Sequence, residues 1–222
     1  MTTSPSSPRK EPRFGFLLLV SFVIFSLGWI VDQTIRWTDH WQGFLCGLFH
    51  VVILGFGWCF TILPWSFLIY GLYEWRGWQR FRTHWILLPS VLILSILLGS
   101  LAFEPPTASH RFKRFAHSKL PGDLRNLRTY FAGGGIADYS DSYCFETSPI
   151  EVTRLISEMK LEQDSQTQFQ AFFNNLEPSR KFDQDLSTWP GLQHYHRYED
   201  GWFYNLYTDG SETRVYIHIG CI

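Results

Sequence analysis

Charged side chains are missing from three long stretches in the first half of this 222-residue chain. Residues 14–31, 43–70 and 85–103 contain no Asp, Glu, Lys or Arg. A helix needs about 20 apolar residues to cross the roughly 30 Å hydrocarbon core of a bilayer, and each stretch is long enough. This absence argues against an ordinary water-soluble protein and predicts three transmembrane helices.

The chain also lacks a basic surplus. Its 19 Lys and Arg residues are balanced by 20 Asp and Glu residues, which gives a formal net charge of -1. A dedicated nucleic-acid binder normally carries a clear excess of basic residues. We therefore expect the partners to be the lipid bilayer and a protein, either another protein or a second copy of the chain, and not nucleic acid.

Recognisable catalytic motifs are absent as well. The sequence has no Gly-x-Ser-x-Gly elbow and no His-Glu-x-x-His zinc motif. The three glycines at 133–135 lack the Lys-Ser/Thr that completes a phosphate-binding loop. No catalytic residue and no cofactor is predicted, and a metal-dependent enzyme is the least favoured function.

Composition divides the chain into four parts. Residues 1–13 are rich in Pro and Ser and predict a disordered leader. Residues 14–103 hold the three spans, and Pro64 predicts a kink in the second one. Residues 104–120 form a basic juxtamembrane linker, and residues 121–222 have the mixed composition of one small soluble domain. The predicted fold is a membrane protein with three transmembrane α-helices followed by a small α+β domain with an antiparallel sheet.

Lys and Arg near the spans predict which side of the membrane each part occupies. Three basic residues precede the first span and three lie between the second and third, against one between the first and second. A basic excess marks cytoplasmic loops. We therefore expect a plasma or inner membrane protein with a cytoplasmic N-terminus and a C-terminal domain outside. Four basic residues just after the third span make this difference small.

The second span carries the features expected of a packing helix. Gly43 and Gly47 are four residues apart, a spacing that permits close helix approach. Within the spans, His50 is the candidate for proton or metal chemistry. Its side chain is either a proton relay or metal ligand, or a neutral group hydrogen-bonded to a neighbouring helix. These features favour packing with the chain itself or with a partner. An accessory subunit of a larger membrane complex is therefore the alternative function.

The basic linker has two interpretations. Arg111, Lys113 and Arg114 could lie on anionic headgroups, where each charge contributes about 1 kcal/mol. Alternatively, Phe112 and Phe115 pack onto the soluble domain and the segment is a solvated linker. The sequence does not decide between them.

The soluble domain is predicted to alternate helices and strands. After a turn at 120–123 we expect a short helix that ends near Phe131, and the alternation within 137–147 predicts a strand. Ser148 and Pro149 are typical of a helix start. The remaining predictions are a helix at 165–176 and a three-stranded antiparallel meander at 192–222.

Two Asp-Gly pairs predict the hairpins of this meander. If Asp200-Gly201 and Asp209-Gly210 each form a two-residue turn, Tyr204 lies opposite Arg197 on one side and Val215 on the other. This register turns the apolar side chains to one face, which we expect to meet the helices. The core-facing set is Trp202, Tyr204, Leu206, Val215, Ile217, Ile219 and Cys221.

The opposite face of the meander, called here the second sheet face, is aromatic and polar. Such side chains are frequent in recognition surfaces, so this face is the predicted binding surface. The alternative is a solvated face or one covered by a loop. The predicted function is a membrane-anchored, non-enzymatic module that binds a protein partner or envelope component through His194, His196, Tyr198, Phe203, Asn205, Tyr207, Arg214 and Tyr216.

Two sharper hypotheses concern metal and disulfide bonds. His194 and His196 have a spacing that can chelate zinc or copper, but the predicted register puts His218 about 13 Å from them. No metal site is therefore predicted. Cys144 and Cys221 are the two cysteines of an extracytoplasmic domain, which favours a disulfide. If the neighbours of Cys144 point into the core, Cys144 itself points away from it, whereas Cys221 points into it. This arrangement favours two separate thiols.

Overall fold

The computed structural model describes residues 13–77, 81–133, 140–164 and 186–221. The chain divides into two compact units. The first comprises residues 1–32 and 47–100, and the second comprises residues 33–46 and 101–222.

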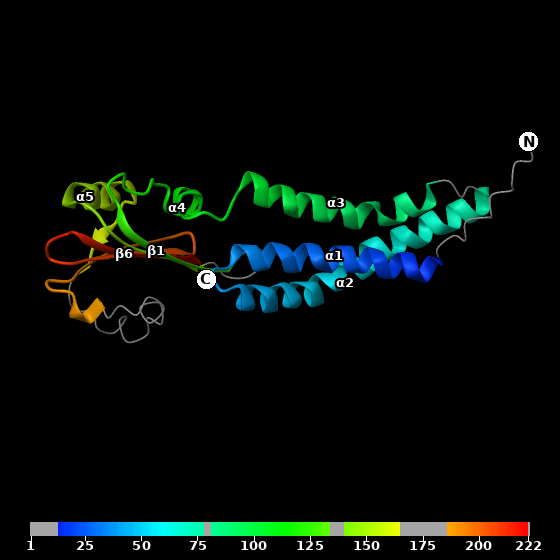
Figure 1. Ribbon diagram of the computed structural model, residues 1–222, viewed down its shortest axis with the longest axis horizontal. Helices are drawn as coiled ribbons and strands as arrows, with labels where there is room; N and C mark the ends of the chain where they lie inside the picture. Colours follow the sequence, from blue (N-terminus) through cyan, green and yellow to red (C-terminus); the bar gives the residue numbers. More distant parts are fainter. Residues whose placement is uncertain (1–12, 78–80, 134–139, 165–185, 222) are drawn as a thin grey trace, which may run out of the picture. The chain divides into compact units, whose positions relative to one another are not determined.

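Three long helices hold the predicted spans (Figure 1). They are α1 (Phe14–Arg36), α2 (His40–Arg76) and α3 (Arg82–Phe103), and each is long and apolar enough to cross a membrane. Helix α2 is continuous and contains Pro64, which confirms a single second helix. The helices extend beyond the uncharged stretches because polar end turns continue the same backbone hydrogen bonding.

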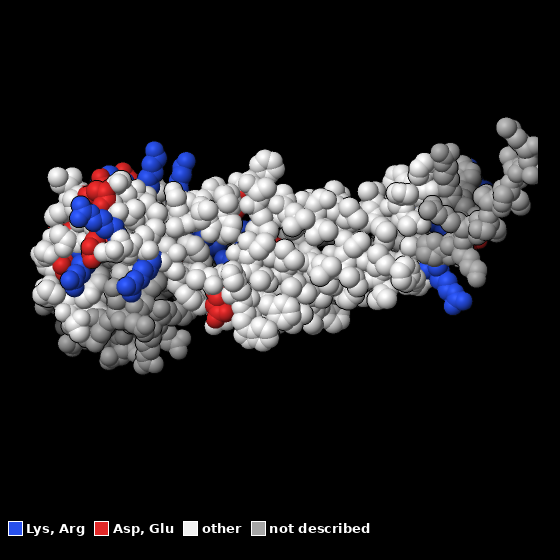
Figure 2. Space-filling view, viewed as in Figure 1, with Lys and Arg blue, Asp and Glu red and all other residues white. Residues whose placement is uncertain are grey.

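The surfaces of these helices are strongly apolar. Only 22%, 22% and 11% of the most apolar windows of α1, α2 and α3 are buried within the protein, and charged atoms are sparse over them in Figure 2. Phe60 and Phe56 of α2 are 80% and 66% exposed. Apolar surface of this extent suits contact with lipid rather than water.

Glycines of α2 allow close contact with α1. A Cβ at Gly47 would lie 2.7 Å from Cα of Ile30, and a Cβ at Gly43 would lie 2.7 Å from the carbonyl oxygen of Gln33. Real Cβ atoms do not approach backbone so closely, so only glycine fits at either position. The predicted packing glycines therefore serve contacts within the chain.

Polar groups inside the helical unit also have partners within it. The hydroxyls of Ser21 and Ser90 are 2.8 Å apart and join α1 to α3. Nε1 of Trp65 donates to the carbonyl oxygen of Trp85. The buried His50 ring stacks on Trp29 of α1, with centroids 5.7 Å apart. The placement of His50 suits the interpretation of a histidine packed against a neighbouring helix.

The second unit is built on a six-stranded antiparallel sheet. The strands run in the order β1-β2-β6-β5-β4-β3, so β1 and β3 are the edges. The antiparallel sheet and the helices packed with it confirm the predicted α+β class. The elements of this unit are α4 (Ala108–Ala116), β1 (Arg125–Ala132), β2 (Ser140–Glu146), α5 (Pro149–Glu158), β3 (Glu162–Gln163), η2 (Leu186–Thr188), β4 (Gln193–Glu199), β5 (Trp202–Thr208) and β6 (Arg214–Cys221).

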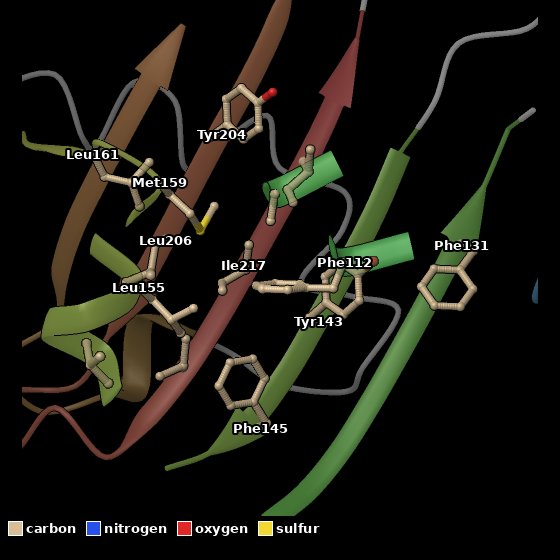
Figure 3. Close-up of a cluster of buried hydrophobic side chains, with 14 residues drawn as sticks. Phe112, Phe131, Tyr143, Phe145, Leu155, Met159, Leu161, Tyr204, Leu206 and Ile217 are labelled. Atoms are coloured by element: carbon tan, nitrogen blue, oxygen red, sulfur yellow. The ribbon is translucent and has the colours of Figure 1, made fainter. Parts of the chain in front are cut away.

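One face of the sheet carries the main hydrophobic core, under α4 and α5 (Figures 1 and 3). Alternate residues of β2, β5 and β6 point into it, as the strand period requires. Helix α4 contributes Phe112, and α5 contributes Val152 and Leu155, all fully buried. The strands contribute Phe131, Tyr143, Phe145, Tyr204, Leu206, Val215, Ile217 and Ile219.

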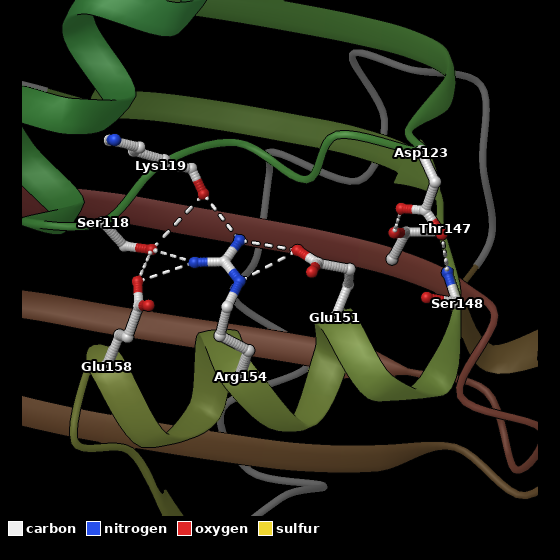
Figure 4. Close-up of polar contacts among 8 residues, drawn as sticks. All are labelled: Ser118, Lys119, Asp123, Thr147, Ser148, Glu151, Arg154 and Glu158. Carbon is white, nitrogen blue, oxygen red and sulfur yellow. Dashed lines mark hydrogen bonds and ion pairs between the residues drawn. The ribbon is translucent and has the colours of Figure 1, made fainter.

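Polar contacts fix α5 on this core (Figure 4). The helix begins after Ser148 with Pro149 in the first turn, as predicted. Arg154 forms ion pairs with Glu151 and Glu158. It also donates to the carbonyl oxygen of Lys119 at 3.0 Å, which ties α5 to the segment after α4.

The short helix predicted to end near Phe131 is wrong. Residues 125–132 form strand β1, which pairs with β2 from Arg125↔Glu146 to Ala132↔Ser140. The Thr129-Tyr130-Phe131 run consists of residue types that fit a pleated surface. Pairing with β2 and burial of Phe131 override the weak local helical pattern. The helix predicted at 165–176 lies outside the described residues.

The predicted register is correct for one hairpin and wrong for the other. Tyr204 pairs with Arg197 as expected, but it pairs with Ile219 instead of Val215. The second turn spans five residues, 209–213, because the Asp209 carboxylate accepts hydrogen bonds from the backbone N–H groups of Thr213 and Arg214. The shift is four residues, an even number, so the predicted faces survive it.

Arg111 does not lie on a membrane surface. It is 4% exposed, and its guanidinium forms a bidentate ion pair with Asp141 of β2. Lys113 and Arg114 are exposed, and Arg114 pairs with Glu104. Of the two interpretations of this linker, packing onto the domain holds for Phe112, which is fully buried, and the headgroup interpretation fails for Arg111, because the amphipathic α4 turns this side toward the core.

Substituting Gly47 tests the close contact between α1 and α2. Gly47→Ala should lower the free energy of unfolding by about 1–3 kcal/mol, because its methyl group meets the Ile30 backbone. Gly57→Ala is the matched control on the same helix, since no described atom lies within 4 Å of its Cβ position. It should raise stability by up to about 1 kcal/mol. Thermal unfolding in mild detergent measures both, and equal effects would contradict the contact.

A double-mutant cycle tests the buried ion pair. Arg111→Met should cost about 3–5 kcal/mol, because it leaves the Asp141 carboxylate buried without its counter-charge. The double variant Arg111→Met with Asp141→Leu should be more stable than the single one, since no uncompensated charge remains. Denaturant unfolding of the full chain measures the cycle. Additive effects of the two substitutions would contradict the pairing.

Candidate functional site

The second sheet face lies opposite the main core, and most of it is buried. His194, Asn205, Tyr207 and Tyr216 are each at most 7% exposed. His196 and Phe203 are half-buried, whereas Tyr198 and Arg214 are exposed. The predicted binding residues therefore share a face, but only its margins are open. Their role in binding stays a prediction.

A small aromatic cluster occupies the middle of this face. Tyr207 and Tyr216 pack with Leu186 of η2, with Trp189 and with Cys144 of β2. Burial raises the pKa of Cys144 to about 11, and burial also raises the pKa of Tyr207 and of Tyr216. These groups stay neutral near pH 7, so the cluster has no activated nucleophile.

An open hollow adjoins this cluster where β1, β2 and β6 run together. It has a volume of about 540 Å³, and it presents two arginines and one indole ring. A second hollow of about 470 Å³ shares Glu146 and Arg214 with it and adds Arg125. The first hollow is lined by Asn126, Leu127, Arg128, Cys144, Phe145, Glu146, Trp189 and Arg214.

Strand β1 forms one wall of this hollow and is an edge of the sheet. The register with β2 shifts between Arg125 and Arg128, and Asn126 has a positive φ of 54°. A bulge of this kind is common at sheet edges. At the other end of the strand, the backbone N–H of Thr38 donates to the carbonyl oxygen of Phe131. In return, the backbone N–H of Phe131 donates to the hydroxyl of Thr38. The α1–α2 turn thus caps one end of β1.

A histidine cluster lies toward the opposite edge of the same sheet. His194 of β4 is within 3.2 Å of the Asp164 carboxylate and 3.0 Å of the Asn205 amide oxygen. The His196 ring stacks on His194, with centroids 5.5 Å apart. Burial lowers the pKa of His194, although hydrogen bonds to Asn205 and Asp164 oppose that effect.

His218 does not join this cluster, and the predicted reason is wrong. It lies in the same row as His196, because Asn205 pairs with both residues. It is therefore two strands away, about 10 Å, and not displaced along the strand. Its Nδ1 is 3.0 Å from the hydroxyl of Ser142.

Of the two alternatives for Cys144 and Cys221, the structure has two separate thiols and no disulfide between them. Cys144 pairs with Tyr216, five residues from Cys221 along β6. That separation is about 16 Å, and an odd number of steps puts the two side chains on opposite faces. No disulfide can bridge that distance.

Comparison with protein-family models, curated proteins and solved structures gives no match for this chain. Its function is therefore argued from the geometry of the two sites.

The sequence did not reveal three residues that shape these sites. Asp164 is 30 residues before His194, and no motif spacing links them. Trp189 lies outside any regular element, so no periodicity marks it as a site residue. Arg128 lies where the sequence predicts a helix and not a strand. The Trp-Pro-Gly sequence before β4 was a usable signal, since it places a large aromatic residue at a turn beside a predicted strand.

Lowering the pH tests the turn that sets the β5–β6 register beside the hollow. Burial alone would raise the pKa of Asp209, but hydrogen bonds from Ser211 and from backbone N–H groups hold it below its usual value. Its stabilising effect is therefore complete above the unfolded-state pKa of about 3.9 and is lost as pH falls through the lower folded-state pKa.

Asp209→Asn should accordingly be less stable than the parent near pH 7 by about 1–2 kcal/mol, because it removes charge-assisted hydrogen bonds. From about pH 5 to about pH 2 the parent should lose more stability than the variant. Denaturant unfolding at several pH values in a non-ionic detergent measures both. Parallel pH profiles would show that Asp209 is not the titrating group.

Proposed function

We propose that this protein is a membrane-anchored, non-enzymatic binding module. The three apolar helices cross the bilayer, and the C-terminal domain offers the hollow beside β1 to a protein partner. The observation that carries the proposal is an open hollow of about 540 Å³ that combines an edge strand, two arginines, one glutamate and a largely buried indole ring.

The proposed topology has support from contacts within the second unit. Residues 33–46, which comprise the end of α1, the turn after it and the start of α2, belong to the same compact unit as the C-terminal domain. Tyr130 of β1 donates to Gln42 in the first turn of α2, in addition to the Thr38 contacts. With three crossings, the first connection and the C-terminal domain share one side of the membrane. The basic residues favour the cytoplasm for the N-terminus, and so the outer side for the domain.

The partner is a polypeptide with acidic side chains in an extended segment. An edge strand has backbone N–H and C=O groups directed away from its sheet, and an added strand can pair with them. Arg125, Arg128 and Arg214 line the two adjoining hollows and would pair with carboxylates. Trp189 lines the first hollow but is only 8% exposed, so it adds a small apolar contact.

The alternative of an accessory subunit that packs through Gly43 and Gly47 has less support. Both glycines already face α1.

Site-specific photo-crosslinking of the full chain in its native membrane tests the proposal. A photoreactive residue in place of Leu127, which is 37% exposed beside the hollow, should form a discrete adduct with the partner. The same residue in place of Ile150, which is 80% exposed on α5, is the matched control and should form none. An adduct of twice the chain mass would identify the partner as a second copy.

Charge reversal separates specific binding from chance proximity. Arg128→Glu combined with Arg214→Glu should reduce the Leu127 adduct at least about tenfold, since the acidic partner is then repelled. Lys119 is exposed and lies outside both hollows, so Lys119→Glu is the matched control and should leave the amount of adduct unchanged. Equal adducts at Leu127 and Ile150, or insensitivity to the reversed arginines, would refute the proposal.

A further inference from the structure

The strongest feature outside the hollow is the histidine cluster at the β3–β4 edge. Asp164 follows β3, and its backbone N–H donates to the carbonyl oxygen of His194, which continues the ladder by one bond. His194 and His196 are two residues apart on β4 and point to the same face. One potential ligand atom from each of the three residues lies within 4.8 Å of the others.

Hydrogen bonding defines the tautomer of His194 in its neutral form. The Asn205 amide oxygen can only accept, so Nε2 of His194 must be the donor at 3.0 Å. A neutral imidazole has a single N–H, so Nδ1 then presents a lone pair. That lone pair faces a carboxylate oxygen of Asp164 at 3.2 Å. A proton on Nδ1, or a metal ion bound by both atoms, would make this contact attractive.

His196 distinguishes the two cations. Its Nδ1 is enclosed by the protein and has no hydrogen-bond partner among the described residues. A proton shared by His194 and Asp164 would form an ordinary ion pair and would leave His196 unsatisfied. A metal ion bound by all three side chains, with Nδ1 as the His196 ligand atom, would satisfy that nitrogen.

The spacing also fits a metal ion. In a tetrahedral zinc site the bonds are about 2.0–2.1 Å long, so neighbouring ligand atoms are about 3.3 Å apart. The distance from Nδ1 of His194 to Oδ2 of Asp164 is 3.2 Å. The hydrogen bond from Nε2 of His194 to Asn205 is the usual outer contact that holds a ligating imidazole in position.

We propose that Asp164, His194 and His196 form a zinc-binding site, with Asn205 as a positioning residue. Three protein ligands leave a fourth coordination position for water or an external ligand. The ion would link the end of β3, a strand of two residues, to β4 and so hold this edge of the sheet. This site lies apart from the hollow beside β1, and the inference does not depend on the partner-binding proposal.

Zinc titration of the full chain in mild detergent, purified without a polyhistidine tag and stripped with a chelator, tests the site. One Zn²⁺ per chain should bind, and the thermal unfolding temperature should rise with zinc concentration, because the ion binds the folded state. Co²⁺ should give the visible absorption bands of a tetrahedral complex. Affinity should fall as the pH is lowered, since protons compete for the imidazoles.

Variants assign the ligands. His196→Ala and Asp164→Asn should each weaken zinc binding at least about tenfold and change the Co²⁺ spectrum. His110→Ala is the matched control, because His110 lies on α4 and outside the cluster, and it should bind like the parent.

If no stoichiometric zinc binds, or if both ligand variants bind like the parent, His194 and Asp164 form only a protonated ion pair and the proposal is overturned. The partner-binding test at Leu127 is unaffected by either result, so the two proposals can fail separately.

Discussion

The buried ion pair between Arg111 and Asp141 is the contact on which the second unit depends. It joins α4, the helix that follows the third apolar helix in the chain, to β2, the strand next to the β1 edge. The Tyr143 hydroxyl donates to the same carboxylate, and the Phe131 ring lies 4.7 Å from the guanidinium carbon. A charge pair enclosed in this way is costly to desolvate, and it persists only because these groups satisfy it together. It fixes α4 on the core face and leaves the other face to the two candidate sites.

Sequence reasoning succeeded where one physical signal dominated. Length and the absence of charge were enough to predict the three long apolar helices. The alternation of apolar and polar residues was enough to predict the two faces of the meander. The β4–β5 register followed from Asp200-Gly201. The failures have a common cause, since each depended on a contact between distant residues. Asp209 widened its turn through hydrogen bonds to Thr213 and Arg214, and β1 became a strand because β2 was available to pair with it.

The residues of the predicted binding surface do share one face of the sheet, but the centre of that face is closed. Neither the cluster around Trp189 nor the Asp164 contact could be deduced from local patterns, because both residues lie outside strands β4, β5 and β6. Burial then divides the second sheet face into an open basic hollow at the β1 side and an enclosed histidine cluster at the β3 side. The strand order puts β1 and β3 at opposite edges of the sheet, so the two sites cannot bind the same metal ion.

The contact between the α1–α2 connection and β1 also limits how the second unit can form. Thr38 supplies both partners for the backbone of Phe131, and Phe131 contributes its ring to the core. A segment that begins after α3 would lack Thr38 and Gln42, and it would expose the end of an edge strand that they cover. Unpaired strand ends promote edge-to-edge association. The complete second unit therefore includes residues 33–46 as well as the segment after α3, and its β1 edge is covered only when both are present.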